Sequence, residues 1–529
     1  MPRRRARASL DGDRARWWFA FAVFAALGAL WALSSPLMSI PDEPAHAVKA
    51  AAVANGQLRG RDELVTQGDA NGPPRLDTHV EVPEFLANAN DYRRCFSFRA
   101  SVPAGCAPAV RQDATPTDAT TTAGTYPPLY YLLVGWPSRL WSGAGALYGM
   151  RLASVAVGAA LLASGLTSAR RAGLSHFTVA GAALAATPMA YFLIGSINPN
   201  GFEIAAAFAT WLAWLELLNQ REVPTARLLV RVVVVSSAFL LARPLSPAFF
   251  ALTVGAVAAM ALTRPRLRTL VAQRSVRLAA VAVTAVGLAS LAWILWSVTN
   301  SASAAESIPG LTFVEGFRGS YDQLWFRTRG MVAVFGWLDT SAPVWVTLGW
   351  LAGTGVLVVL ALVVGTWRRR LVLLVTVVAT IVAPLAAEAA GAPRIGYVWQ
   401  GRYSLPLAMG VPILAAWIAA DRYEPPDWLR PTRGAALVAA AVGTAVAQFV
   451  AQSFALTRYI VGLPAPYLAY VRGDGWAPPL ARWGLFALAA AACLASACLF
   501  VAVGQDPAAS ERFEQPTDEA ITRMIVPGR

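Results

Sequence analysis

"WWFAFAVFAALGALWALSSPLMSIPDEPAH", residues 17–46, joins a long apolar run to a cluster of ionisable side chains. The apolar part, which ends at Leu33, is long enough to cross a bilayer as a helix. Asp42, Glu43 and His46 follow shortly after its end. Because further apolar runs come later in the chain, we interpret the first run as a membrane span and not as a cleaved signal peptide. The stretch thus predicts a span that ends beside side chains able to transfer protons.

The whole chain has the composition of a polytopic membrane protein. Of its 529 residues, 56% are hydrophobic and only 14% are charged, and the mean hydropathy is +0.49. An ordinary soluble protein is less apolar and more highly charged. Basic residues exceed acidic ones by 14. They fall in short clusters between apolar runs and not on one soluble domain, so nucleic acid is not an expected partner.

Spanning segments recur along most of the chain. Twelve apolar segments have the required length, at 17–35, 146–168, 176–195, 200–219, 228–243, 245–263, 277–299, 343–366, 371–389, 402–420, 433–455 and 481–503. A further apolar segment, 126–141, is shorter and contains three prolines. The predicted fold is therefore all-α and polytopic, with about 12 spanning helices.

Arginine clusters predict the orientation of these helices. With 12 crossings, four clusters share the side of the basic residues 1–16, namely 168–173, 264–277, 366–370 and 421–433. Cytoplasmic loops carry an excess of Arg and Lys, so this side is expected to be the cytoplasm and both termini are expected there, in a multi-pass protein of the cytoplasmic membrane. Segment 126–141 is then expected to be an interfacial or re-entrant helix on the outer side, anchored by its Tyr and Trp residues.

This topology divides the chain into four parts. They are a basic cytoplasmic N-terminus (1–16), a transmembrane domain (17–455) with large outer loops at 36–145 and 300–342, a last outer loop and final span (456–504), and a cytoplasmic tail (505–529). The tail is polar and expected to be disordered. Cys95 and Cys106 lie in the first outer loop, where an oxidising environment permits a disulfide; two reduced cysteines are the alternative.

The start of the first outer loop is expected to form a helix with three polar residues on one face. Ser39 and Asp42 have the Ser-x-x-Asp spacing of a capping box, which predicts a helix start here. Asp42, His46 and Lys49 then share a face, because their spacing is i, i+4, i+7. A solvated helix start, with acids favoured by the helix dipole, is the alternative. Ionisable residues at a membrane boundary are nevertheless candidates for function.

The motif "SINPNGFE" (196–203) lies in a short outer loop. Asn198, Asn200 and Glu203 offer oxygens that suit sugar hydroxyls or a metal ion, although a tight turn uses the same residue types. With only three His in the chain, a His-rich metal centre is not expected. An oxygen-ligated Mg²⁺, Mn²⁺ or Ca²⁺ site stays open.

Two motifs at the outer boundary and one turn between spans carry further candidates. Gln400, Arg402 and Tyr403 lie in "RIGYVWQGRYSLP" (394–406), where Arg402 suits phosphate oxygens and an interfacial anchor equally well. Asp339, in "FGWLDTSAPVW", is either a substrate-binding residue or a helix cap. Arg243, in "LLARPLSP", is a weaker candidate for binding phosphate.

Five motifs, "PDEPAH", "PPLYY", "NPNG", "FGWLDTSAP" and "QGRYSLP", resemble in order and position the bacterial membrane proteins called the domain of unknown function 2142 family. The resemblance covers about residues 20–455. That family is similar to the GT-C superfamily of glycosyltransferases, which use polyprenyl-phosphate sugars on the outer side of the membrane. The resemblance implies a GT-C-like fold, with Asp42 or Glu43 as catalytic base or metal-linked carboxylate. Where the superfamily often has a second acid, this chain has Asn198 and Asn200.

Two functions are consistent with these features. The resemblance implies a glycosyltransferase that moves a sugar from a polyprenyl-phosphate donor in the bilayer to an envelope glycan, lipid or protein. Asp42 or Glu43 would take the acceptor's proton, and Arg402 and Arg243 would stabilise the leaving phosphate. A non-enzymatic transporter or assembly partner that binds lipid-linked glycans is the alternative. Transporters carry ionisable residues deep in their spans, and the scarcity of such residues here favours the enzyme.

Overall fold

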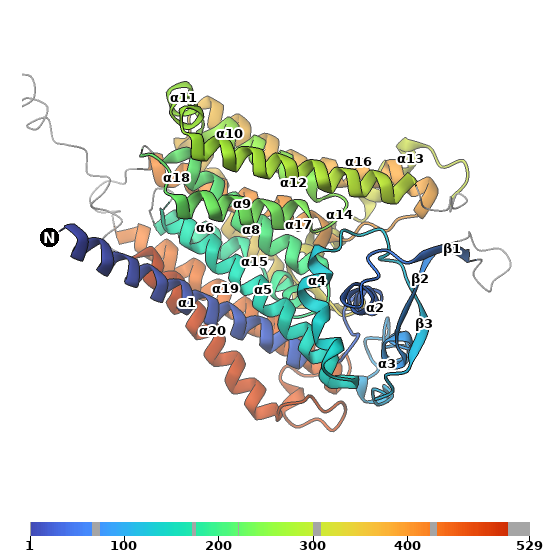
Figure 1. The fold of residues 1–529 in the computed structure, drawn as a ribbon. Helices are drawn as coiled ribbons and strands as arrows, with labels where there is room; N and C mark the ends of the chain where they lie inside the picture. The colour runs from blue at the N-terminus through green and yellow to red at the C-terminus, as the bar shows by residue number, and fades with distance from the viewer. Residues whose placement is uncertain are drawn as a thin grey trace, which may run out of the picture.

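The computed structural model describes residues 2–65, 75–171, 176–220, 222–299, 308–423 and 431–505. This part of the chain forms long α-helices and two small sheets (Figure 1). Nine of the described helices are long and apolar enough to cross a membrane, or up to 11 if each of two bent helix pairs counts as one span. The prediction of an all-α polytopic fold is confirmed.

Every predicted span coincides with a helix or with a pair of consecutive helices. These are α1 (Pro2–Ser34), α5 (Gly143–Arg171), α6 (His176–Ala185) with α7 (Pro188–Ile194), α8 (Pro199–Asn219), α9 (Ala226–Leu240), α10 (Ser246–Ala261), α12 (Arg274–Thr299), α15 (Val344–Val364), α16 (Trp367–Ile395), α17 (Gly401–Ala408) with α18 (Gly410–Arg422), α19 (Pro431–Ile460) and α20 (Arg482–Gly504). The pair α6–α7 bends by 58° where Pro188 begins α7, since proline cannot continue the hydrogen-bond ladder of the preceding helix. Segment 126–141 forms only α4 (Leu129–Gly135) and the 3₁₀ turn η2 (Trp136–Arg139), which are too short to span.

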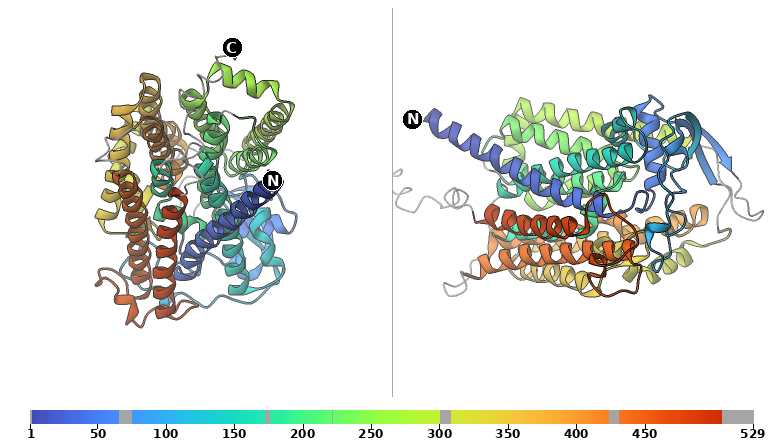
Figure 2. Two further views of the ribbon diagram at one scale, coloured as in Figure 1. Left: turned by 90° about the vertical axis from the view of Figure 1, so that its left-hand side faces the viewer. Right: turned by 90° about the horizontal axis from the view of Figure 1, so that it is seen from below.

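The long helices lie side by side, and the remaining elements gather at one end of the bundle (Figures 1 and 2). We call this end the loop end. It carries α2 (Glu43–Ala54), β1 (Arg61–Val65), β2 (Arg75–Pro83), α3 (Glu84–Ala87), η1 (Ala104–Cys106), β3 (Pro116–Thr121), α13 (Phe313–Asp322), α14 (Leu324–Val332), β4 (Val334–Phe335), β5 (Thr340–Ser341) and η4 (Ala469–Val471). The opposite end carries the start of α1 and the short helix α11 (Arg264–Ala272). The tail beyond Gln505 and most of the cluster 421–433 lie outside the described residues.

Small antiparallel sheets organise the loop end. The first has the order β1-β2-β3, so that His79 of β2 lies opposite Arg61 on one side and Thr120 on the other. The second is the hairpin β4–β5, in which Phe335 pairs with Thr340. A disulfide joins Cys95 to Cys106 in the loop between β2 and β3.

Helix α8 is the centre of the bundle. Of its most apolar 18 residues, 94% are buried inside the protein, and it packs against α5, α9 and α10. Trp211 of α8 is fully buried and its indole N–H donates to the carbonyl of Pro406, at 3.0 Å. The first turn of α8 lies at the loop end, so this rigid helix fixes the position of residues 196–203.

The predicted capping box at Ser39 is wrong. Helix α2 begins at Glu43, and its N-cap is Asp42, whose side chain makes no capping hydrogen bond. Asp42 has a φ of 65°, in the left-handed region that Asp tolerates better than most residues. Ser39 lies before this turn and is not the N-cap. The Asp42 carboxylate is therefore free of the helix end and available to other partners.

Candidate functional site

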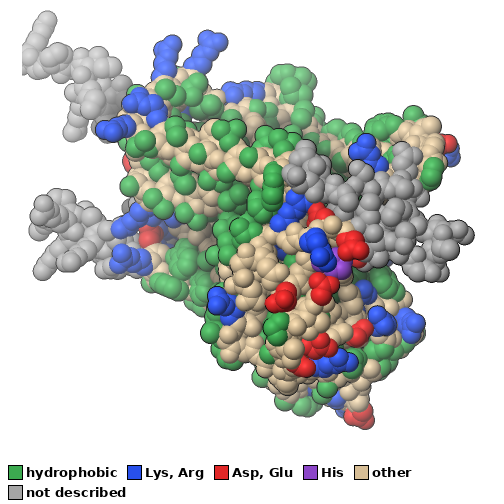
Figure 3. Space-filling view, turned by 45° about the vertical axis from the view of Figure 1, so that its right-hand side comes forward, with side chains coloured by type: hydrophobic (Ala, Val, Ile, Leu, Met, Phe, Trp, Pro, Cys, Tyr) green, Lys and Arg blue, Asp and Glu red, His purple; other side chains and the backbone are tan. Residues whose placement is uncertain are grey.

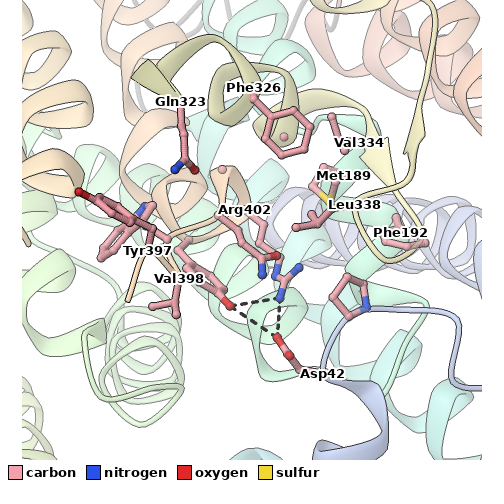
Figure 4. A pocket seen from close by; sticks show the side chains of 16 residues that line it. Asp42, Met189, Phe192, Gln323, Phe326, Val334, Leu338, Tyr397, Val398 and Arg402 are labelled. Carbon is pink, nitrogen blue, oxygen red and sulfur yellow. Dashed lines mark hydrogen bonds and ion pairs between the residues drawn. The ribbon is translucent and has the colours of Figure 1, made fainter. Parts of the chain in front are cut away.

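A cavity of about 370 Å³ lies at the loop end, among α2, α7, α14 and α17 (Figure 4). Among the described residues that line it, Asp42 is the one acidic side chain and Arg402 the one basic side chain. The lining residues are Pro41, Asp42, Met189, Phe192, Gln323, Phe326, Gly330, Val334, Leu338, Tyr397, Val398, Trp399, Gln400, Gly401, Arg402 and Tyr403. Four predicted site residues therefore share one cavity: Asp42, Gln400, Arg402 and Tyr403. Asp42 and Arg402 are 360 residues apart in the chain.

Asp42, Arg402 and Tyr403 form a hydrogen-bonded group in the wall of this cavity. Arg402 Nη2 donates to Asp42 Oδ2 at 2.5 Å and to the Tyr403 hydroxyl at 3.1 Å. The Tyr403 hydroxyl donates to the same carboxylate oxygen at 3.5 Å. The side chain of Arg402 is 3% exposed, whereas that of Asp42 is 41% exposed. The group thus presents an open carboxylate that is held by a buried guanidinium (Figure 4).

Glu43 occupies a different environment from its neighbour. Its side chain is 0% exposed and forms a two-pronged ion pair with Arg151, at 2.7 Å from Nε and 2.6 Å from Nη2. The backbone N–H of Ile197 donates to the same carboxylate, at 3.2 Å. Glu43 does not line the cavity. Of the two acids in the motif, only Asp42 can reach a molecule bound there.

Asn198 and Asn200 hold the backbone beside Asp42. The Asn198 amide donates to the carbonyl of Pro41 at 2.9 Å, and its Oδ1 accepts the Asn200 backbone N–H at 2.9 Å. Both asparagines are buried. Asn198 is the N-cap of α8, so the predicted turn interpretation describes these residues, and they support the site from behind.

A second carboxylate–guanidinium pair lies behind the cavity. Glu203 accepts hydrogen bonds from Arg243 at 3.1 Å and from the Ser246 hydroxyl at 2.6 Å. The Arg243 guanidinium lies 4.6 Å from the centre of the Tyr403 ring. Neither Glu203 nor Arg243 lines the cavity, so this pair supports Tyr403 from within the protein.

His46 is buried behind Asp42 and is 3% exposed. Its Nδ1 lies 3.0 Å from the Tyr131 hydroxyl. Burial lowers the pKa of His46 to about 3; the nearby Asp42 opposes this shift, and Arg243 and Arg402 add to it. His46 is therefore neutral at physiological pH and packs the side of α2 that faces α4.

Lys49 anchors the other end of the predicted polar face. Its ammonium donates to the backbone carbonyls of Leu58 at 2.7 Å, Gly124 at 2.9 Å and Arg59 at 3.3 Å. Burial, and to a smaller extent Arg59, lower its pKa to about 7. Lys49 does not line the cavity. It joins α2 to the loops around the first sheet.

Asp339 and Gln400 differ in their access to the cavity. Asp339 pairs with Arg458 at 2.7 Å and does not line the cavity, although its neighbour Leu338 does. Arg458 also donates to three carbonyls of the disulfide-bonded loop, and this ties the β4–β5 hairpin to that loop. Gln400 lines the cavity, and its buried Oε1 has no hydrogen-bond partner among the described residues.

Several arginines that position the site were not predicted from the sequence. Arg151 lies inside a predicted apolar span, which is a recognisable signal because a charge there needs a partner. Arg327 pairs with Glu388, and Glu388 also accepts the backbone N–H of Trp399 at 2.7 Å. This pair holds the cavity wall that contains Trp399. Its formation depends on two distant helices, so no local pattern could reveal it.

The donor groups do not fit a divalent metal. Within the described part of the chain, no three His, Cys, Asp or Glu residues form a cluster that could hold one. The Asp42 carboxylate is bonded to Arg402, and the Glu203 carboxylate to Arg243. A metal cation at either position would lie beside a guanidinium of the same charge, which disfavours its binding. The metal-linked role implied by the resemblance therefore has no support in this geometry.

A family model described as "Predicted membrane protein (DUF2142)" matches residues 25–411, which is most of the chain. The chain belongs to this family. It is accordingly a membrane protein with multiple apolar helices. A comparison with curated proteins finds no match.

Among solved structures, the chain is similar to ArnT from Cupriavidus metallidurans. Two structures match, one in the apo state with a TM-score of 0.42 and one bound to undecaprenyl phosphate with a TM-score of 0.40. In both, the identity is 15%, and the match covers 92% of this chain and 76% of ArnT. With an identity of 15% and TM-scores below 0.5, the similarity to ArnT carries no conclusion about the Asp42 site.

Proposed function

We propose that the protein is a membrane glycosyltransferase. It transfers a sugar from a polyprenyl-phosphate donor to a glycan, lipid or protein of the cell envelope, at the outer face of the cytoplasmic membrane. The observation that carries the proposal is the Asp42–Arg402 pair in the loop-end cavity, in which an open carboxylate lies 2.5 Å from a buried guanidinium. The resemblance of five sequence motifs to proteins similar to GT-C enzymes supports the choice of donor.

Asp42 is suited to act as the general base. An acceptor hydroxyl attacks the anomeric carbon of the donor sugar while the Asp42 carboxylate takes the hydroxyl proton. The new bond joins the acceptor oxygen to the anomeric carbon, and the bond from that carbon to the phosphate oxygen breaks. Attack from the side opposite the leaving group inverts the configuration of the anomeric carbon. The 41% exposure of the carboxylate allows the acceptor to approach it.

Arg402 is suited to receive the leaving phosphate. Its planar guanidinium binds phosphate oxygens through parallel N–H bonds, and its buried Nε has no hydrogen-bond partner among the described residues. Negative charge develops on the phosphate as the sugar leaves, and a fixed cation stabilises that charge with little reorganisation. Because the carboxylates present are already paired with arginines, we propose that this chemistry proceeds without a metal ion.

Charge at the two ends of the bundle supports the proposed orientation. The end opposite the loop end carries arginines on α5, α11 and α16, including Arg170, Arg171, Arg264 and Arg268. In Figure 3 this end displays basic side chains, all of them Arg, with few acids, whereas the loop end displays many acids among its basic side chains. Basic residues favour the cytoplasmic side. We therefore assign the termini to the cytoplasm and the Asp42 cavity to the outer face.

The test is the release of polyprenyl phosphate from a panel of radiolabelled polyprenyl-phosphate sugars by the purified protein. General-base assistance is typically worth about 10²–10⁴ in rate, so Asp42→Asn should slow release by that factor. Asp91→Asn is the matched control: Asp91 lies in the same loop, is 42% exposed and also pairs with an arginine, but it does not line the cavity. Full activity of Asp42→Asn would contradict the mechanism. Release from none of the donors by the wild type would favour a binding protein.

A further inference from the structure

A second cavity, of about 320 Å³, lies at the loop end outside the Asp42 site. Three aromatic side chains from separate parts of the chain line it: Tyr92 from the turn after α3, Tyr148 from α5 and Trp476 from the loop before α20. The other lining residues are Ala, Pro, Gly, Val and Leu, so none of the described lining residues carries a charge. We call it the aromatic cavity.

Two of the aromatic residues offer free hydrogen-bonding groups. Neither the Tyr148 hydroxyl nor the Trp476 indole N–H has a hydrogen-bond partner within the part of the chain that the structure describes. The Tyr92 hydroxyl, in contrast, donates to the carbonyl of Phe85 at 3.1 Å and accepts the Arg111 backbone N–H at 3.3 Å. The Tyr92 hydroxyl is therefore already hydrogen-bonded, whereas the Tyr148 hydroxyl and the Trp476 indole N–H can bind a ligand.

A disulfide and close backbone packing hold the loops that line the aromatic cavity. The Cys95–Cys106 disulfide closes the loop that contributes Ala104 and Gly105, and residues 107–110 follow directly after it. This loop contacts the loop around Trp476 so closely that a Cβ on Gly105 would lie 3.3 Å from the backbone of Gly475. A Cβ on Gly475 would lie 1.7 Å from the Ile460 carbonyl oxygen. Only glycine therefore fits at Gly475.

Uncharged aromatic walls with a few free polar groups match the chemistry of a neutral sugar. One face of a sugar ring presents C–H groups, which suit the negative face of an aromatic ring. Its hydroxyls need hydrogen-bond donors and acceptors, which Tyr148 and Trp476 supply. Ligand pockets are typically about 300–1,000 Å³ in volume and mostly apolar, with a few placed polar groups. The aromatic cavity, at about 320 Å³, lies at the small end of that range.

The two cavities share one short segment of chain. Pro36 and Leu37 line the aromatic cavity, and Pro41 and Asp42 line the other. Asp42 lies five positions after Leu37, so their Cα atoms are at most about 18 Å apart even if the chain is fully extended. Arg151 fixes this segment through the carbonyl of Pro36, at 2.8 Å. A glycan of a few sugar units is long enough to bridge the distance between Leu37 and Asp42.

We infer that the aromatic cavity binds an uncharged sugar unit of a glycan acceptor, whose reacting hydroxyl then lies at Asp42. The inference rests on the proposed function and narrows its acceptor from a glycan, lipid or protein to a glycan. The Tyr148 hydroxyl and the Trp476 N–H bind the sugar hydroxyls, and the aromatic faces pack against the ring.

Binding of neutral disaccharides tests the inference without turnover. The full-length protein, in a detergent without a sugar head group, is titrated with maltose, cellobiose and mannobiose, and binding is followed by calorimetry and saturation-transfer NMR. We expect saturable binding of at least one disaccharide by the wild type. Tyr148→Phe removes only a hydroxyl and should weaken binding about 3- to 10-fold, the effect of one lost hydrogen bond. Trp476→Phe should weaken it at least as much.

Two exposed aromatic residues provide matched controls. Tyr321→Phe and Trp483→Phe change the same chemical groups at side chains that are 58% and 66% exposed and line neither cavity. These two control variants should bind the disaccharides as tightly as the wild type does. All four variants should keep the melting profile of the wild type. The inference would be overturned if none of the three disaccharides bound saturably. It would also be overturned if Tyr148→Phe and Trp476→Phe bound as tightly as the wild type. A protein that binds disaccharides but releases no polyprenyl phosphate would refute the transferase alone.

Discussion

Replacement of Glu43 by Gln should destabilise the fold and leave the reaction chemistry intact. The substitution keeps the shape of the side chain but removes the negative charge that faces Arg151. Both side chains are 0% exposed, so Arg151 would stay buried without a counter-ion. It would keep its hydrogen bonds to the carbonyls of Ala32, Ser35 and Pro36, but these are dipoles and do not neutralise a full charge.

The expected cost follows from this burial. Removing one partner of a buried ion pair typically costs about 3–5 kcal/mol, because the remaining charge is uncompensated. We expect a loss of that size for Glu43→Gln and a similar loss for Arg151→Met. The double variant removes both charges together, so its cost should be smaller than the sum of the two by about 1–3 kcal/mol, as for other directly contacting pairs.

The assay is the free energy of unfolding of the purified protein in mixed micelles, measured for the wild type, both single variants and the double variant. Sugar transfer is measured on the fraction that stays folded, with Asp91→Asn as a control for the loss of one carboxylate in the same loop. A Glu43→Gln protein as stable as the wild type but inactive would refute the reasoning, because it would make Glu43 a reacting group. Additive costs in the double variant would show that the ion pair is not the cause.

Three further variants test the site and its support. Arg402→Lys keeps the charge but loses the planar fork, so we expect about a tenfold rise in the KM for the donor. His46→Gln should flatten the pH dependence of the melting temperature. Because burial holds the pKa of His46 at about 3, the unfolded chain takes up a proton between pH 6.5 and 3 that the folded protein does not, so stability falls as the pH drops through this window. Joint replacement of Cys95 and Cys106 by Ser should cost about 2–4 kcal/mol of stability in the same unfolding assay.

A different result would contradict each of these three predictions. A donor KM unchanged in Arg402→Lys would mean that the guanidinium does not contact the phosphate. Equal pH profiles for the wild type and His46→Gln would mean that other groups cause the acid instability. If the double Ser variant melts like the oxidised wild type, the disulfide contributes nothing to stability, and reduction of the wild type should then also have no effect.

Most of the spans were predictable because a helix in a membrane must satisfy its backbone hydrogen bonds internally and present apolar side chains outward. Twelve spans were predicted, whereas the described residues contain 9 candidate spans, or up to 11 with the bent pairs. The predicted span 228–243 is not among them, because its helix α9 has only 15 residues. That constraint acts within each segment, so it is visible in the local pattern of residues. The absence of a span at 126–141 followed in the same way from its length and its three prolines. The start of α2 was also predicted, although its cap is Asp42 and not Ser39.

The roles of the candidate residues were not predictable in this way. Asp42 and Glu43 are neighbours with the same chemical group, and the pattern of residues could not distinguish them. The difference between them comes from partners that are distant in the chain: Arg402 lies 360 residues from Asp42, and Arg151 lies 108 residues from Glu43. Residues 42 and 43 point in different directions from the start of α2, so one carboxylate lines a cavity and the other is enclosed.

The amino-acid sequence alone determined the class of the protein, its spans and the end of the bundle where polar residues gather, since hydropathy and charge act over short stretches of chain. Only the tertiary structure separated the open carboxylate of Asp42 from Glu203 and Asp339, which pair with Arg243 and Arg458. A charge inside a protein needs a partner, and which partner it meets depends on how distant helices pack. The aromatic cavity, too, became visible only in the folded chain, because its three aromatic side chains come from distant parts of the chain.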